Sequence, residues 1–74
     1  MTTRTLAYKH YIFMFQFTNK ESFVYLKNTR NELLQRIELE EGSLEDIAQN
    51  HNGNLNNFFR ETIQRYESDK FKKS

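Results

Sequence analysis

Hydrophobic and polar positions divide the chain into an N-terminal half with the period of a β-strand and a C-terminal half with the period of an α-helix. From Leu6 to Thr18 the chain is dense in aromatic and apolar residues. The alternating positions are Tyr11, Phe13, Phe15 and Phe17, with Ile12, Met14 and Gln16 between them. This pattern predicts one long strand. Apolar residues on both of its sides predict a strand that is covered on both faces.

The next segment, Ser22 to Lys27, is open to two interpretations. Its β-forming residues follow the polar turn Asn19 to Glu21, which favours a hairpin with strands near 8–18 and 22–27. Alternatively, a helix begins at Ser22 and is capped by Thr18 or Asn19. In that case the first strand needs a copy of itself as a partner, because an unpaired apolar strand promotes aggregation. Either way we expect a homodimer through the region of Tyr11, Phe13, Phe15 and Phe17.

Helical spacing dominates the rest of the chain. Leu33, Leu34 and Ile37 predict a helix over Glu32 to Glu41, which ends at Gly42. Ser43 is suited to cap a short second helix, and Asn52-Gly53 predicts a sharp turn because both residues tolerate positive φ. A third helix is expected from Leu55 to about Asp69.

Together these patterns predict a single α+β domain over residues 1–74. Its N-terminal strand or hairpin is followed by two or three α-helices, and the last two helices form a pair like a helix-turn-helix. The ends, residues 1–5 and 70–74, lack apolar periodicity and are expected to be flexible.

The composition excludes several kinds of chemistry but does not by itself specify a function. The 74-residue chain has no Cys, which excludes a disulfide framework and thiolate chemistry. The only histidines, His10 and His51, lack the spacing of a metal site, so no metal or cofactor is expected. No segment resembles a signal peptide or a membrane span, and we expect a cytoplasmic protein without a membrane partner. No constellation of residues indicates an enzyme.

Charge is segregated along the chain although the net charge is only +1. Residues 1–31 contain five Lys or Arg and one Glu, residues 32–51 are acidic, and the C-terminal end is basic again. Such segregation suits a protein with one polyanion-facing side. A solvated surface of mixed charge is the alternative interpretation.

The stretch from Ser43 to Tyr66 resembles the helix-turn-helix of tetracycline-repressor-type regulators. Ser43 to Ala48 is followed by a turn and then by Phe58-Phe59-Arg60, so a small Ala stands at the helix crossing and an aromatic pair in the recognition helix. The turn departs from the family pattern, because Asn52 stands four residues after Ala48, where Gly is usual, and Gly53 follows. Residues 56–66 are also similar to the second helix of ribbon-helix-helix repressors. We rank this resemblance below the resemblance to a helix-turn-helix.

The helix-turn-helix resemblance implies a small, non-enzymatic transcriptional regulator that binds duplex DNA. The N-terminal part of the third helix would enter the major groove, where Asn and Arg side chains can read base edges. The residues implied in DNA contact are Asn54, Asn56, Asn57, Arg60, Gln64 and Arg65. The structural interpretation of the Asn-rich segment is that its side chains cap helices and fill turns.

A second hypothesis is a small inhibitor or accessory subunit that docks on a larger protein. Its docking surface would be the acidic segment 32–46, which would bind a basic partner. The residues that would carry this contact are Glu40, Glu41, Glu45 and Asp46.

Overall fold

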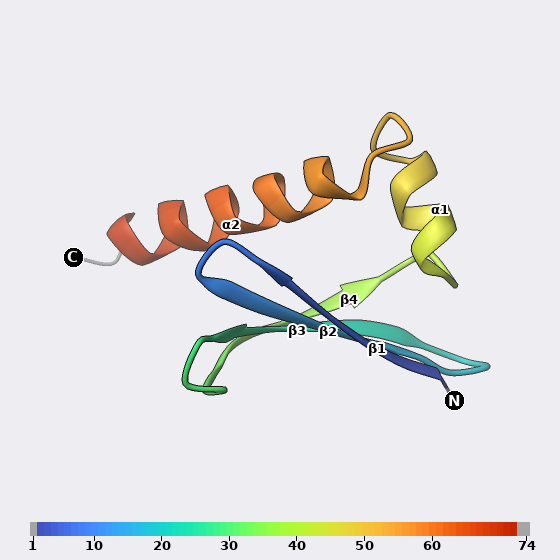
Figure 1. Ribbon diagram of the computed structural model, residues 1–74, viewed down its shortest axis with the longest axis horizontal. Coiled ribbons are helices and arrows are strands. Elements are labelled where there is room, and N and C mark those ends of the chain that lie inside the picture. The colour runs from blue at the N-terminus through green and yellow to red at the C-terminus, as the bar shows by residue number, and fades with distance from the viewer. Residues whose placement is uncertain (1, 73–74) are drawn as a thin grey trace. The chain divides into compact units, whose positions relative to one another are not determined.

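The computed structural model describes residues 2–72, without the side chains of residues 71 and 72. It contains four β-strands followed by two α-helices (Figure 1). The strands are β1 (Thr2–Tyr8), β2 (Tyr11–Phe17), β3 (Ser22–Asn28) and β4 (Leu33–Leu39), and the helices are α1 (Leu44–Gln49) and α2 (Leu55–Lys72). The chain separates into two compact units, Met1–Ser43 and Leu44–Ser74.

The first unit is a four-stranded antiparallel meander with the order β1-β2-β3-β4. The predicted fold class is therefore wrong, because strands dominate the chain and only two helices follow them. The segment expected to be a helix over Glu32 to Glu41 contains strand β4. The hairpin interpretation of Ser22 to Lys27 is confirmed, since this segment is β3 and pairs with β2.

The single long strand expected from Leu6 to Thr18 is instead divided between β1 and β2 by a turn at Lys9 and His10. Lys9 adopts a φ of 55°, which only a minority of non-glycine residues do. Thr2 to Thr5 were expected to be flexible but pair with β2 as part of β1. At the other end, α2 continues beyond Asp69 to Lys72, and residues 73–74 lie outside the described residues.

Side chains close the other two turns of the meander. The Thr18 hydroxyl accepts a hydrogen bond from the Glu21 amide (2.9 Å), which shapes the β2–β3 turn. In the β3–β4 turn, Asn28 Oδ1 accepts hydrogen bonds from the amides of Arg30 (2.9 Å) and Glu32 (3.0 Å). Asn31 takes the left-handed conformation there, with a φ of 66°. Thr and Asn suit turns because their side chains bond to nearby backbone groups.

Strict alternation along β2 and β3 gives the sheet one buried face. The cross-strand pairs Phe13–Leu26 and Phe15–Val24 lie on it, and all four side chains are 0% exposed. Phe17 pairs with Ser22 at the end of the same face, and both residues are buried. The intervening residues of the strands form the second face, which we call the open face. On the three strands β2, β3 and β4 it comprises Ile12, Met14, Gln16, Phe23, Tyr25, Lys27, Leu33, Arg36 and Glu38.

The second unit consists of α1, α2 and the loop between them, in agreement with the predicted helices. Ile47 of α1 and Phe58, Phe59 and Ile63 of α2 are buried. The loop ends α1 through a hydrogen bond from the Gly53 amide to the Ala48 carbonyl (2.8 Å), the six-to-one bond of a Schellman-type cap. Asn52 and Gly53 have φ values of 61° and 75°, as expected for a sharp turn.

The two glycines of the chain form a matched test of this turn. Gly53→Ala is expected to lower the free energy of unfolding by about 1–2 kcal/mol, because an L-residue with a Cβ resists the left-handed conformation. A Cβ at Gly53 would meet nothing within 4 Å, so the loss arises from the backbone alone. Gly42 also has free space around it and no positive φ, so Gly42→Ala is the control and should not destabilise. Denaturant unfolding followed by circular dichroism measures both, and equal losses would contradict this account.

Candidate nucleic-acid interface

Two of the three Asn residues implied in reading DNA, Asn54 and Asn57, stabilise the helical unit. Asn54 Oδ1 accepts a hydrogen bond from the Asn56 amide (2.9 Å), which makes Asn54 the cap of α2. Asn57 Nδ2 donates to the His51 carbonyl (2.9 Å), and Asn57 Oδ1 accepts from the Arg60 guanidinium. Asn54, Asn57 and Arg60 are therefore engaged locally, while the Asn56 side chain is exposed.

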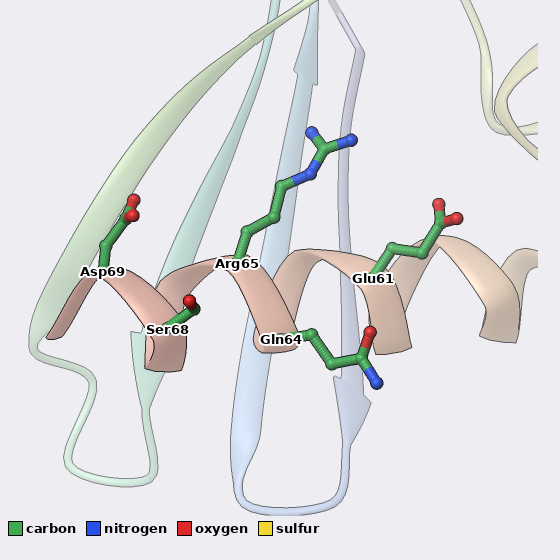
Figure 2. Close-up of a pocket in the computed structure, with 5 residues that line it drawn as sticks. All are labelled: Glu61, Gln64, Arg65, Ser68 and Asp69. Carbon is green, nitrogen blue, oxygen red and sulfur yellow. The ribbon is translucent and has the colours of Figure 1, made fainter. Parts of the chain in front are cut away.

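Farther along α2, Gln64 and Arg65 are exposed, but acidic residues surround the arginine. Figure 2 shows Glu61, Arg65 and Asp69 projecting from the same side of α2, one helical turn apart, with Gln64 and Ser68 beside them. Such an acid–base–acid row is typical of a solvated helix face. The row carries a net negative charge, which opposes the approach of DNA phosphates.

His51 contacts both Glu61 and Asn57 of α2. Its Nδ1 lies 2.9 Å from Glu61 Oε2, and its ring meets the edge of Phe58 with the centroids 5.4 Å apart. The residues Asn50, His51, Asn52, Asn57, Arg60, Glu61 and Gln64 line a shallow polar depression of about 390 Å³. Among the described residues no group of three or more His, Cys, Asp or Glu could hold a metal ion.

The acidic residues of the protein-docking hypothesis are divided between the two units. Glu40 and Glu41 follow β4 at the end of the first unit, whereas Glu45 and Asp46 lie in the first turn of α1. The last two suit that position, because carboxylates interact favourably with the positive end of a helix dipole. Three of the four are exposed and Glu41 is half-buried. Protein docking through these residues stays a prediction.

The open face of the sheet carries a second set of candidate residues, which the sequence interpretation missed. Phe23 and Tyr25 are neighbours on this face of β3, with ring centroids 6.5 Å apart. The Arg36 guanidinium lies over the Phe23 ring, 4.8 Å from its centroid. The Tyr25 hydroxyl donates to Gln16 Oε1 (3.2 Å) on the neighbouring strand.

The signal for this face was present in the sequence. In Ser22 to Lys27 the residues Ser22, Val24 and Leu26 alternate with Phe23, Tyr25 and Lys27, and the structure buries the first set and leaves the second partly exposed. Once β3 is recognised as a strand with one covered side, the period of two assigns Phe23, Tyr25 and Lys27 to the other side. Arg36 could not be added, because its segment was interpreted as a helix.

The predicted dimer contacts lie largely inside the chain. Phe13 and Phe15 are fully buried and Phe17 is 7% exposed, so these three rings offer almost no surface to a second subunit. Tyr11 is half-buried. A homodimer therefore requires contacts other than the three phenylalanines.

The different environments of Asn57 and Asn56 predict different effects on stability. Asn57→Ala removes a partly buried hydrogen bond to the His51 carbonyl and should lower the free energy of unfolding by about 1 kcal/mol. Asn56→Ala, its exposed neighbour, is the control and should change it by less than about 0.5 kcal/mol. Thermal and denaturant unfolding measure the difference. If both variants lose the same stability, Asn57 does not hold the turn.

None of the described residues belongs to a helix that is long and apolar enough to cross a membrane. Comparisons of the chain with protein-family models, with curated proteins and with solved structures found no match.

Proposed function

We propose that this protein is a small, non-enzymatic binding module for single-stranded nucleic acid, and that the open face of its sheet is the binding surface. The observation that carries the proposal is the adjacent pair Phe23 and Tyr25, flanked by Arg36 and Gln16. Aromatic rings on an antiparallel sheet stack on unpaired bases, and this stacking tolerates any base. Action in the cytoplasm is part of the proposal.

The spacing of the two rings favours a single strand over a duplex. Their centroids are 6.5 Å apart. That separation is nearly twice the rise of about 3.4 Å between successive nucleotides of duplex DNA. Two neighbouring bases can therefore stack on Phe23 and Tyr25 only if the strand is extended and its bases are unpaired, and the base at Phe23 would displace the Arg36 guanidinium from that ring.

Polar and charged groups around the rings fit a polyanion with exposed base edges. Lys27 follows Tyr25 on the same face of β3, and Arg36 lies across from Tyr25 on β4. Both cations can contact phosphates, and the planar Arg36 guanidinium can also stack on a base. The Gln16 amide, one strand away, can form hydrogen bonds with base edges. Glu38, opposite Phe23, is the acidic residue of the face and limits its positive charge.

A regulator that binds duplex DNA through α2 is the second candidate. It is favoured by the exposed side chains of Gln64 and Arg65, which make no hydrogen bond or ion pair within the part of the chain that the structure describes. The carboxylates of Glu61 and Asp69 beside Arg65 count against this candidate. So do the hydrogen bonds that Asn54 and Asn57 make within the helical unit.

Fluorescence anisotropy with a labelled mixed-sequence oligonucleotide tests the proposal. Tyr25→Ala should weaken binding of the single strand by roughly 5- to 150-fold, which corresponds to a stacking energy of about 1–3 kcal/mol. Tyr25→Phe should retain most of the affinity, because it keeps the ring and loses only the hydroxyl. Tyr8→Ala is the matched control, since Tyr8 is also half-buried but shares a face with Leu6, the partner of Phe13.

The same experiment at several salt concentrations, and with the duplex in place of the single strand, separates binding by the open face from binding by α2. Two phosphate contacts, from Lys27 and Arg36, predict a slope of log K against log salt of about −1.4 for a single strand. The duplex of the same sequence should bind more weakly. If the duplex binds more strongly, and Arg65→Ala lowers this affinity while Tyr25→Ala does not, the binding surface is α2 rather than the open face. Failure of the wild-type protein to bind either form at low salt would reject both candidates.

A further inference from the structure

The sheet has two edge strands, β1 and β4, and they differ in how well they are protected. Each pairs with a neighbour on one side only in the described chain. β4 carries Arg36 and Glu38, and its pairing with β3 is interrupted by a register shift. Charges and bulges of this kind protect an edge against further pairing. β1 has a regular register over all seven residues, and Arg4 is its only charged residue.

The hairpin geometry determines which backbone groups of β1 remain open. Tyr8 and Tyr11 flank the two-residue turn, so they form a hydrogen-bonded pair, and the pairs along the ladder then alternate. Leu6 and Arg4 consequently direct their backbone groups toward β2. Thr3, Thr5 and Ala7 direct theirs away from it, and all three residues are exposed.

We infer that β1 is a self-association edge, on which the β1 strand of a second copy pairs antiparallel around a two-fold axis at Thr5. This register pairs the whole strand: Thr5 faces its own copy, Thr3 faces Ala7, and Arg4 faces Leu6. Thr3, Thr5 and Ala7 then exchange the hydrogen bonds that are open in one copy. A two-fold axis at Thr3 or Ala7 would leave most of the strand unpaired.

The side chains of β1 are compatible with this pairing. Arg4 meets Leu6 of the second copy rather than another Arg4, so no like charges stand opposite each other. Thr opposite Thr is a favourable cross-strand pair. The corresponding arrangement of β4 around its central residue would place Arg36 opposite Arg36. Self-complementarity therefore selects β1 over β4.

The paired sheet would bring two binding surfaces together. Residues directly opposite each other in an antiparallel pair lie on the same face of the sheet. Thr5 pairs with Met14 and shares the open face with Tyr25, so the open faces of both copies would lie on one side of a continuous sheet. The association itself does not depend on the proposed function, because its test contains no nucleic acid.

Sedimentation equilibrium over a concentration series tests the inference. We expect a reversible dimer with twice the 9.0 kDa mass of the chain. Thr5→Pro should weaken it by roughly tenfold or more, because proline removes an edge amide and leaves an acceptor unpaired. Proline is tolerated on an edge where the amide faces solvent, so the monomer should keep its fold. Thr5→Val retains the amide and Arg36→Ala leaves β1 unchanged, so both should keep most of the dimerisation of the wild type.

Cysteine substitutions test the register independently of proline. The chain has no cysteine of its own, so each introduced thiol is unambiguous. Thr5→Cys should form an intermolecular disulfide under mild oxidation, because facing Cα atoms of a hydrogen-bonded pair lie about 5.5 Å apart. Thr3→Cys alone should not, since its copy lies about 13 Å away along the strand. Thr3→Cys combined with Ala7→Cys should restore the cross-link.

A dimer weakened by Thr5→Pro and cross-linked through Thr5→Cys supports the inference. A monomer at all concentrations overturns it. So does a dimer that Thr5→Pro leaves intact and that Thr3→Cys cross-links as efficiently as Thr5→Cys. If nucleic acid fails to bind while the dimer is observed, only the proposed function is lost.

Discussion

The pleat of β2 and β3 is the constraint on which the first unit depends. Because successive residues of a strand point to opposite faces, the pairs Phe13–Leu26 and Phe15–Val24 bury one face and thereby assign Phe23 and Tyr25 to the other. A slip of one residue in this register would exchange the faces. The large side chains on the buried face make such a slip costly. The same interaction that stabilises the sheet therefore positions the rings of the open face.

The polar turns show how local chemistry keeps that register. Thr18 and Asn28 each stand at the end of a strand and bond to amides inside the following turn. These bonds fix the lengths of the β2–β3 and β3–β4 turns, and turn length sets which residues face each other. In the helical unit, Asn54, Asn57 and Gly53 have an equivalent role. Most of the Asn residues that attracted a DNA-reading interpretation thus have a structural explanation.

Much of the local structure was predictable from sequence, but the fold class was not. The alternation of Tyr11 to Phe17 and the turn residues Asn52 and Gly53 gave correct elements, because each segment contains a strong local signal. β4 was missed because Leu33, Leu34 and Ile37 fit a helical stripe. Leu39, which departs from that stripe, alternates with Glu38 and Ile37 as a strand requires. Pairing with β3 makes this segment a strand rather than a helix. The periodicity of a single segment cannot show which neighbour the segment pairs with.

The turn between β1 and β2 illustrates a different limit. Its left-handed residue is Lys9, with neither Gly nor Asn to mark it, and the polar β1 strand lacks an apolar stripe of its own. The sequence therefore suggested one long strand with a flexible end. For the candidate site the consequence was direct, because a strand that is expected to be covered on both faces leaves no open face. Arg36 reaches Phe23 only because β4 completes the sheet beside β3.

The energetics of stacking indicate why the number of rings on the open face matters. On the proposed function, two rings at about 1–3 kcal/mol each would supply about 2–6 kcal/mol, whereas dissociation constants of 1 mM and 1 μM correspond to about 4 and 8 kcal/mol. Lys27 and Arg36 would add phosphate contacts that salt weakens. One copy alone would therefore hold a single strand only loosely. Joining two open faces on one side of a sheet makes the second contact intramolecular and raises avidity without any new type of contact. A 74-residue binding module with two rings on its open face would therefore gain most from association along an edge that leaves this face free.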